Sequence, residues 1–251
     1  MKVLKRLVPI YIIMVYCVIA LSGCAAVTDY AGKEMVDRAK KLHTGLEAAH
    51  ITVREYVRDE GDPVNGTAFA ASPVVQEIWY RFAGDVMQYM YIGRDPESGE
   101  EYYEFNNGTE LDTWHTGDEK WAFAAKGSEG FYNYSRTSRH YFADGDRLLD
   151  DHLNAVKSSF VSDQQEGLNL IFIGYDSEMI AQNGQMTGVQ DYSQAYYINP
   201  AAEDGLCREQ QIQYRKDGKI YIFDMFAEPA DPAAPIERAE PAALSGEITE
   251  G

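Results

Sequence analysis

Cysteine and positive charge are both scarce in this chain of 251 residues. Three cysteines are too few for a disulfide-dense scaffold, and at positions 17, 24 and 207 they form no cysteine cluster for a zinc site. Lys and Arg number 22 against 40 Asp and Glu, so the formal net charge is −18. Nucleic-acid binding needs a concentrated basic surface that neutralises phosphates. This composition therefore excludes nucleic acid as a partner.

The signatures of common catalytic and metal sites are also missing. No two of the five histidines stand four residues apart, as the zinc motif HExxH requires, and the chain contains no GxSxG, Walker loop or GxGxxG. The acidic loops at 95–101 and 144–151 lack the ligand order of a calcium-binding EF-hand loop. We therefore expect no enzyme activity, no cofactor and no metal site.

The amino terminus has the plan of a secretory signal peptide over residues 1–23. Lys2, Lys5 and Arg6 precede an uncharged stretch at 7–21, and small residues follow. The segment Leu21-Ser22-Gly23-Cys24 resembles the bacterial lipobox. The resemblance implies that Cys24 becomes the lipidated first residue of the mature protein.

An uncleaved transmembrane anchor is the alternative, because the apolar run could extend toward the roughly 20 residues that span a bilayer. Both interpretations place the body on the extracytoplasmic side of the cell membrane, and in the favoured one the lipid anchor makes the membrane a partner. Cys17 would leave with the signal peptide, so Cys207 is the one cysteine expected in the folded body. No intramolecular disulfide is then possible.

The remainder is expected to form a lipidated tether at 24–32, one domain at 33–238 and a disordered tail rich in Pro, Ala and Glu at 239–251. Hydrophobic residues make up 45% of the chain and charged residues 25%, as in ordinary globular domains. Apolar residues recur at helical spacing over 33–46. A second helix is predicted from Asp146, where Leu149, Leu153, Val156 and Phe160 repeat at similar intervals.

Strand patterns fill most of the rest of the domain. They fall at 51–57, 76–82, 86–92, 101–105, 110–114, 121–125, 168–175, 195–198, 209–215 and 219–226. Asn107-Gly108 and Asp217-Gly218 are typical of two-residue type I′ hairpin turns. Because strands dominate and do not alternate with helices, we predict an α+β domain with a curved antiparallel sheet and two helices packed on its concave face.

Tyrosine is abundant, with 18 residues that fall mostly in the predicted strands. A tyrosine combines an apolar ring with a polar hydroxyl, which suits a partly solvated binding surface for a sugar or a peptide. Strands also favour aromatic residues for purely structural reasons, so both interpretations stay open.

The order of these elements resembles a known family. A lipobox, an amphipathic helix, a meander of strands and the turn Thr116-Gly117-Asp118-Glu119 before Trp121 are similar to the lipoprotein-carrier fold of the LolA/LolB and LppX/LprG lipoproteins. The final hairpin, with Asp217-Gly218 leading into an apolar strand, adds to the resemblance. It implies an unclosed β-barrel around helices, with a cavity for acyl chains between them.

Candidate ligand-binding residues follow from the apolar positions that could line such a cavity. They are Ile78, Tyr80, Phe82, Met90, Ile92, Leu149 and Leu153. The leading hypothesis is a membrane-anchored, non-enzymatic lipoprotein that binds an apolar or amphiphilic small molecule between sheet and helices. The alternative is an envelope adhesion or sensing module that presents a tyrosine-rich sheet face to a peptide, a glycan or a protein partner of unknown identity.

Overall fold

The computed structural model describes residues 46–63, 65–134, 156–163, 169–176, 178, 187–198 and 207–245. The expected signal peptide, Cys24, the tether and nearly all of the helix expected at 33–46 lie outside these residues. So do the candidate ligand residues Leu149 and Leu153. No helix within the described part of the chain is long and apolar enough to cross a membrane.

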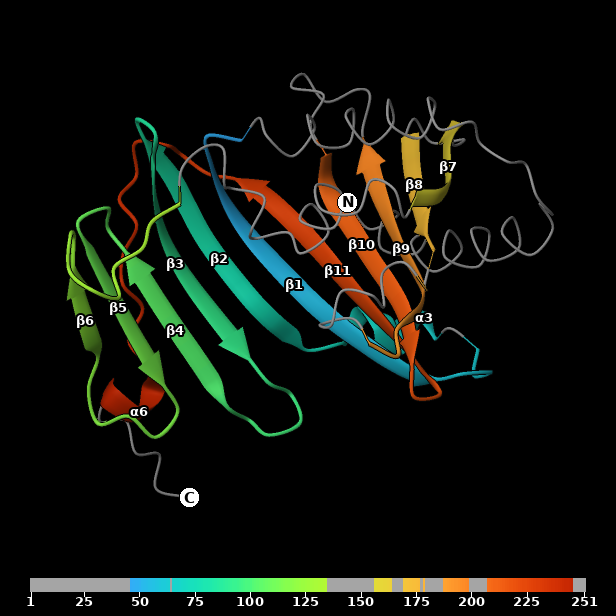
Figure 1. The fold of residues 1–251 in the computed structure, drawn as a ribbon, viewed down its shortest axis with the longest axis horizontal. Helices are drawn as coiled ribbons and strands as arrows, with labels where there is room; N and C mark the ends of the chain where they lie inside the picture. The colour runs from blue at the N-terminus through green and yellow to red at the C-terminus, as the bar shows by residue number, and fades with distance from the viewer. Residues whose placement is uncertain are drawn as a thin grey trace.

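One open antiparallel sheet forms the framework of the described structure (Figure 1). Its eleven strands are β1 (Ala48–Asp59), β2 (Val74–Ala83), β3 (Val86–Arg94), β4 (Glu101–Asn106), β5 (Glu110–His115), β6 (Ala122–Ala125), β7 (Val156–Asp163), β8 (Asn169–Tyr175), β9 (Gln190–Ile198), β10 (Cys207–Lys216) and β11 (Lys219–Pro229). Their spatial order is β6-β5-β4-β3-β2-β1-β11-β10-β9-β8-β7. The two edge strands do not pair, so the predicted unclosed antiparallel sheet is confirmed.

Two meanders meet in the middle of this sheet. Strands β1 to β6 form one half and β7 to β11 the other, and each neighbouring pair within a half is consecutive in the sequence. The halves join where β1 pairs with β11, from Ala49 opposite Pro229 to Asp59 opposite Lys219. The first and last of the described strands therefore lie side by side.

Turn chemistry explains two of the hairpins. Asp217 and Gly218 both have positive φ, 51° and 74°, and Lys216 pairs with Lys219, as a type I′ turn requires. The turn between β4 and β5 differs from the prediction, because only Gly108 has positive φ there, at 94°. The Asn107 side-chain oxygen instead accepts hydrogen bonds from the backbone N–H groups of Thr109 and Glu110, both at 2.9 Å, and this stabilises a longer loop.

Two short helices occur in the described residues, α3 (Gly66–Ala70) and α6 (Ala242–Ser245). Asn65 caps α3 by accepting from the N–H groups of Thr67 and Ala68 at 3.0 and 3.2 Å. The helix predicted from Asp146 is wrong at its carboxyl end, because Val156 and Phe160 belong to strand β7. The sequence predicts two helices packed on the concave face of the sheet. No such helices are among the described elements.

The segment after β11 packs against the sheet. We call residues 230–245 the C-terminal arm; it runs from the end of β11 to α6, which lies beside β5 and β6 (Figure 1). The sequence predicts disorder from residue 239, whereas in the structure Ala239 and Leu244 pack against buried residues of β3, β4 and β5. Residues 246–251 of the expected tail lie outside the described chain.

Candidate functional site

Strand register assigns the side chains to two faces of the sheet. Ile78 stands opposite Ile51 on β1 and Tyr91 on β3, so all three project to one side. We call this side the tyrosine face, because tyrosines from both halves of the sheet lie on it. Their positions are Tyr80, Tyr89, Tyr91 and Tyr102 in the first half and Tyr175, Tyr192, Tyr196, Tyr214 and Tyr221 in the second. The other side is called the outer face.

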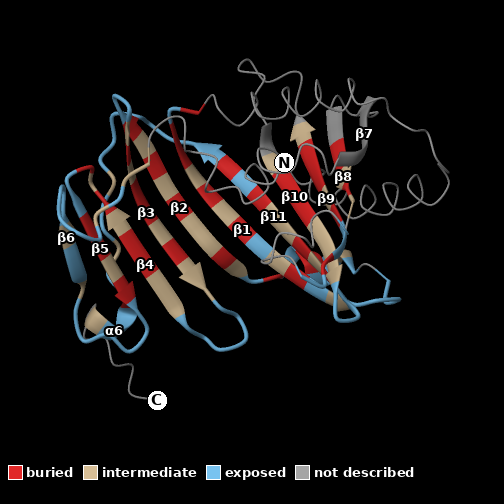
Figure 2. Ribbon diagram, viewed as in Figure 1, coloured by how far each residue is buried: buried red, intermediate tan, exposed pale blue. Residues whose placement is uncertain are grey.

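Aliphatic side chains occupy the middle of the tyrosine face. The buried cluster there contains Leu46, Ala49, Ile51, Val53, Val75, Ile78, Tyr80, Phe82, Met87, Tyr89, Met225 and Ala227, and Phe223 packs against it. Figure 2 shows buried positions recurring along the central strands. Ile78 and Met87 are completely buried, and burial of one such side chain contributes about 1.5–3 kcal/mol to stability. This cluster joins the two halves across the β1–β11 seam.

The candidate ligand residues divide between the two faces. Ile78, Tyr80 and Phe82 lie together in the central cluster of the tyrosine face. Met90 and Ile92 lie on the outer face, since Met90 stands opposite Trp79 in the register of β2 with β3. They pack there with Tyr103 and Trp114. The five described candidates therefore do not line one surface.

A buried carboxylate organises the tyrosines of the first half. Glu104 on β4 is 6% exposed and accepts hydrogen bonds from the hydroxyl groups of Tyr89, Tyr102 and Tyr132. Burial, together with the charge of Glu104 and hydrogen bonding to it, raises the pKa of all three tyrosines above the ordinary range. Tyr134 adds a ring contact to Tyr89, with centroids 5.4 Å apart. The segment that follows β6 is thereby fastened to the tyrosine face.

An aromatic ladder crosses the second half of the same face. The rings of Tyr192, Tyr214 and Tyr221 stack from β9 through β10 to β11, with centroids 6.2 and 5.1 Å apart and interplanar angles of 6° and 18°. Phe223 stacks on Tyr214 at 6.0 Å, and Tyr175 meets Tyr192 edge to face. Tyr214, Tyr221 and Phe223 are only half-buried. Because these rings stack on one another, the ladder offers ring edges and hydroxyl groups rather than open ring faces.

Two glutamines place amide groups within this aromatic surface. Gln194 is fully buried, and its side-chain oxygen accepts from the hydroxyls of Tyr175 and Tyr196 at 3.1 and 2.9 Å. Gln210 on β10 lies between Tyr196 on β9 and Met225 on β11 and is 1% exposed. The tyrosine face is therefore largely apolar, with a few hydrogen-bonding groups at fixed positions.

The outer face is covered at β3 to β5 by the C-terminal arm. Ile236, Ala239 and Leu244 of the arm pack against the cluster of Met90, Ile92, Tyr103 and Trp114. Arg238 closes the contact: its guanidinium lies 2.7 Å from Asp112 Oδ2 and 5.0 Å from the Trp121 ring centre. Arg81 also donates to the backbone oxygen of Ala234 at 2.9 Å.

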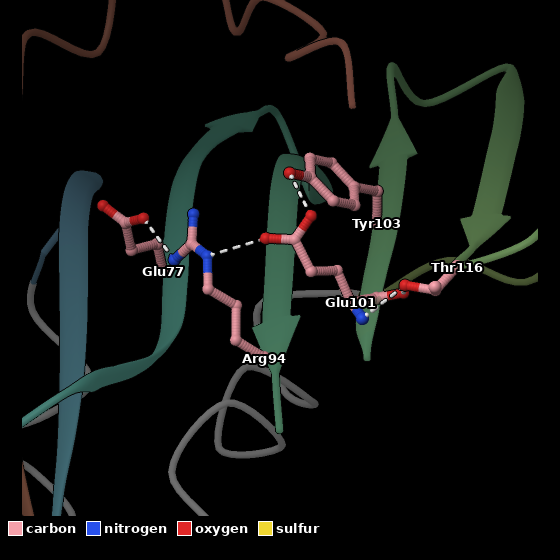
Figure 3. Close-up of polar contacts among 5 residues, drawn as sticks. All are labelled: Glu77, Arg94, Glu101, Tyr103 and Thr116. Carbon is pink, nitrogen blue, oxygen red and sulfur yellow. Dashed lines mark hydrogen bonds and ion pairs between the residues drawn. The ribbon is translucent and has the colours of Figure 1, made fainter. Parts of the chain in front are cut away.

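A polar network spans the outer face of β2 to β4 (Figure 3). Arg94 bridges two carboxylates, with Nη1 2.7 Å from Glu77 and Nε 3.2 Å from Glu101. The Tyr103 hydroxyl donates to Glu101 at 3.2 Å, and the Glu101 backbone N–H donates to the Thr116 hydroxyl at 2.7 Å. These carboxylates are engaged in cross-strand ion pairs, which is a structural arrangement.

A second acidic group lies on the outer face where the two halves meet. Asp224 on β11 stands opposite Arg54 on β1 and Gln211 on β10. Burial and the nearby charge of Glu209 raise the pKa of Asp224, and the Arg54 charge partly opposes this. No group of three or more His, Cys, Asp or Glu side chains in the described part of the chain could hold a metal ion.

Several residues of the tyrosine face are not among the candidates predicted from the sequence. Tyr102 and Glu104 stand two residues apart in a strand, and this spacing places both side chains on one face. Their proximity could therefore be predicted from the sequence. Tyr89 and Tyr132 join them only through pairing with β3 and through the loop after β6. Gln194 and Gln210 are polar residues in alternating strands and have no signal that marks them as buried.

No family model matches the chain, and no curated protein matches it. Solved structures similar to it include the lipoprotein LppX of Mycobacterium tuberculosis, at 9% identity and a TM-score of 0.45, over 84% of this chain and 100% of that one. LprF of Mycobacterium bovis is similar at 14% identity and a TM-score of 0.42, also over 84% and 100%. A LolA superfamily protein of Nitrosomonas europaea is similar at 8% and 0.28, over 82% and 95%. At these identities the similarity assigns no ligand to this chain.

Proposed function

We propose that the protein is a lipid-anchored, extracytoplasmic and non-enzymatic lipoprotein whose tyrosine face binds an apolar or amphiphilic, lipid-like molecule. One observation carries the proposal: a single sheet face joins an aliphatic centre to tyrosines on both sides. An acyl chain gains free energy from aliphatic contact. The hydroxyl groups at the flanks suit the polar part of an amphiphile, since a tyrosine side chain combines an apolar ring with a hydroxyl that can form hydrogen bonds.

The orientation of the rings favours an amphiphile over a glycan. A sugar is recognised largely by packing against an open aromatic face. In the ladder, Tyr214 has Tyr192 against it on one side and Tyr221 on the other, with Phe223 also stacked on it. Its edge and hydroxyl are what it offers to a ligand above the sheet. A chain molecule that lies along these edges fits this arrangement better than a sugar ring does.

Lipid retention tests this proposal. The full chain, expressed in a bacterium and purified in detergent, is extracted with organic solvent, and the extract is analysed by mass spectrometry. Tyr214→Ser should lower the retained lipid several-fold, because it removes the central ring of the ladder. The matched control is Phe226→Ser, an aromatic on the outer face that is 42% exposed, and it should retain lipid like the parent. Absence of any stoichiometric lipid from the parent would contradict the proposal.

The anchor is tested separately through Cys24. Cells that express Cys24→Ala should incorporate no labelled palmitate into the protein and should accumulate its unprocessed precursor. Cys207→Ala is the control. Because Cys207 lies in strand β10, far along the chain from the lipobox, its replacement should leave the labelling unchanged. Equal labelling of Cys24→Ala and the parent would contradict the anchoring part of the proposal while leaving ligand binding open to its own test.

A further inference from the structure

Gln210 is a buried amide without a hydrogen-bond partner. Its side chain is 1% exposed, and neither the amide nitrogen nor the amide oxygen is paired with any of the residues that the structure describes. Its cross-strand neighbours on the tyrosine face are Tyr196 and Met225. Buried polar groups in proteins are nearly always hydrogen-bonded, so an exception of this kind needs a physical explanation.

Gln194, on the same face, is a buried glutamine whose side chain does form hydrogen bonds. Its oxygen accepts from two tyrosine hydroxyls, those of Tyr175 and Tyr196. Each hydroxyl has one hydrogen to donate, and both are directed to Gln194. The nearest tyrosine across from Gln210 therefore donates elsewhere. Gln210 keeps two N–H donors and one acceptor for a group that is not part of the described sheet.

We propose that Gln210 is a ligand-binding residue whose amide nitrogen donates a hydrogen bond to an ester carbonyl of an acyl lipid. This inference rests on the proposed function and names the ligand chemistry at one position of the tyrosine face. Gln210 stands beside Met225 and the aliphatic cluster, so a carbonyl bound there places the acyl chain on that cluster.

The surroundings of Gln210 favour a neutral ester over a free fatty acid. Tyr196, Met225 and Ile212, its neighbours on the same face, carry no charge. A buried carboxylate would need a cation or several donors to offset its desolvation. An ester carbonyl needs one donor, and Gln210 supplies it. The second N–H and the oxygen remain for a hydroxyl group of the same lipid.

A competition between two lipids tests the inference. The full chain in detergent is mixed with equal amounts of a dioctanoylglycerol and the matching dioctylglycerol diether, and native mass spectrometry gives the ratio of the two bound forms. Both probes share chain length and hydroxyl group, so the ratio reports on the carbonyl. The parent should prefer the ester by roughly five- to tenfold, the value of one net hydrogen bond. Gln210→Leu should bind both probes with a ratio near one.

Gln211→Leu is the matched control. Gln211 is the next residue on the strand and is 7% exposed, but it lies on the outer face, opposite Asp224. Its replacement should leave the ester preference intact. In the absence of lipid, Gln210→Leu should melt at the same temperature as the parent or higher, because an unpaired amide is replaced by an apolar side chain. A residue with a purely structural hydrogen-bonding role would give lower thermal stability when replaced.

Three results would overturn the inference. A parent that binds both probes equally contradicts the role of Gln210 and leaves the proposed function standing. An ester preference retained in Gln210→Leu does the same. A parent that binds neither probe contradicts the proposed function, and the inference with it.

Discussion

Glu104 is the residue on which most of the tyrosine contacts of the first half depend. Three hydroxyl groups donate to its two carboxylate oxygens within a site that is 6% exposed. Hydrogen bonds to an ionised acceptor are stronger than neutral ones, at about 1.5–3 kcal/mol each. These contacts also hold Tyr132, which reaches β4 from the loop after β6. The carboxylate thus ties a loop to the sheet.

Glu104→Gln should destabilise the fold by about 2 kcal/mol, because an amide presents an N–H₂ group where the carboxylate accepts hydrogen bonds. The measurement is urea unfolding followed by tyrosine and tryptophan fluorescence. Glu101→Gln is the matched control: it lies on the same strand, faces the other side and is 32% exposed at its ion pair with Arg94. Its cost should stay below about 1 kcal/mol. Equal costs for the two variants would contradict a special role of Glu104.

Asp224 gives a prediction that depends on pH. Burial and the charge of Glu209 raise the pKa of Asp224 to about 8, from an ordinary value of 3.8. The folded state therefore holds a proton that the unfolded state has released, and stability decreases as pH rises from about 4 to 8. Asp224→Asn should remove this loss and stabilise the protein at pH 8, by about 1–2 kcal/mol after allowance for solvent screening of a partly exposed group.

Thermal melts of Asp224→Asn and the parent across this pH range provide the measurement. The difference between the two melting temperatures should be small near pH 4 and should widen up to pH 8. A constant difference would mean that the substitution acts through packing and not through the proton. A lower melting temperature of Asp224→Asn at pH 8 would mean that the ionised carboxylate stabilises the fold through Arg54, which stands opposite it on β1.

At the scale of elements, the C-terminal arm is tied to the sheet by an ion pair between the half-exposed Arg238 and a buried carboxylate, that of Asp112. The Asp112 side chain is 9% exposed and has Arg238 as its ionic partner, while its second oxygen is unpaired among the described residues. Arg238 also contacts the Trp121 ring and Glu240. Removal of the arginine leaves a buried charge without compensation, which costs more than an exposed pair is worth.

Arg238→Met should therefore destabilise the protein by about 2–3 kcal/mol and shift tryptophan emission to longer wavelength as the arm loosens. The double variant Asp112→Asn/Arg238→Met should recover part of that stability, because the orphaned charge is gone. Glu240→Gln, which alters an exposed partner of Arg238, should cost less than about 1 kcal/mol. A double variant as unstable as the sum of the two single variants would show that the pair is not coupled.

Periodicity predicted most strands of the sheet but assigned the residues of β7 to the end of a helix, for a reason visible in the residues. Val156 and Phe160 are four apart, and this spacing places two side chains on one face of a helix and equally on one face of a strand. Leu149 and Leu153 extend the same spacing toward the amino terminus, and a repeat of this length is typical of a helix. In the structure, the residues from Val156 form the edge strand β7.

The candidate site was divided between the two faces for a related reason. Spacing alone places Ile78, Tyr80 and Phe82 on one face of β2, and this is what the register shows. The face of Met90 depends on the length of the turn between β2 and β3. Because Ala83 pairs with Val86, even positions of β2 stand opposite odd positions of β3. Met90 consequently projects to the outer face, and no local pattern reveals this without the turn geometry.

At the scale of the whole molecule, the net charge of −18 bears on the proposed attachment to a membrane. Anionic lipid headgroups repel an acidic body and attract clusters of Lys and Arg. The excess of acidic residues therefore disfavours electrostatic binding of the domain to an anionic bilayer. This supports the proposal that an acyl anchor, rather than the protein surface, makes the attachment.

The sheet as a whole is joined at one long-range seam. Residues of β1 and β11 pair across about 160 to 180 positions of the sequence, whereas β1 to β6 connect through neighbouring hairpins. Contacts between distant residues require a large loss of chain entropy before they form, and this slows folding. We expect the hairpins of each half to form first and the seam to form after the rate-limiting step.

Two identical substitutions test this order. Ile78 in β2 and Ile222 in β11 are both completely buried. The strand partners of Ile78 are Ile51 and Tyr91, both in the first half, whereas Ile222 stands opposite Tyr56 across the seam. Replacement of either by Val should cost about 1 kcal/mol. If the seam forms last, Ile78→Val slows refolding from urea, whereas Ile222→Val leaves refolding nearly unchanged and speeds unfolding about fivefold. Stopped-flow measurements over a range of urea concentrations separate the two rates. Slower refolding of Ile222→Val, equal to that of Ile78→Val, would mean that the seam is already formed in the transition state, because a substitution affects the folding rate only through contacts present at that point.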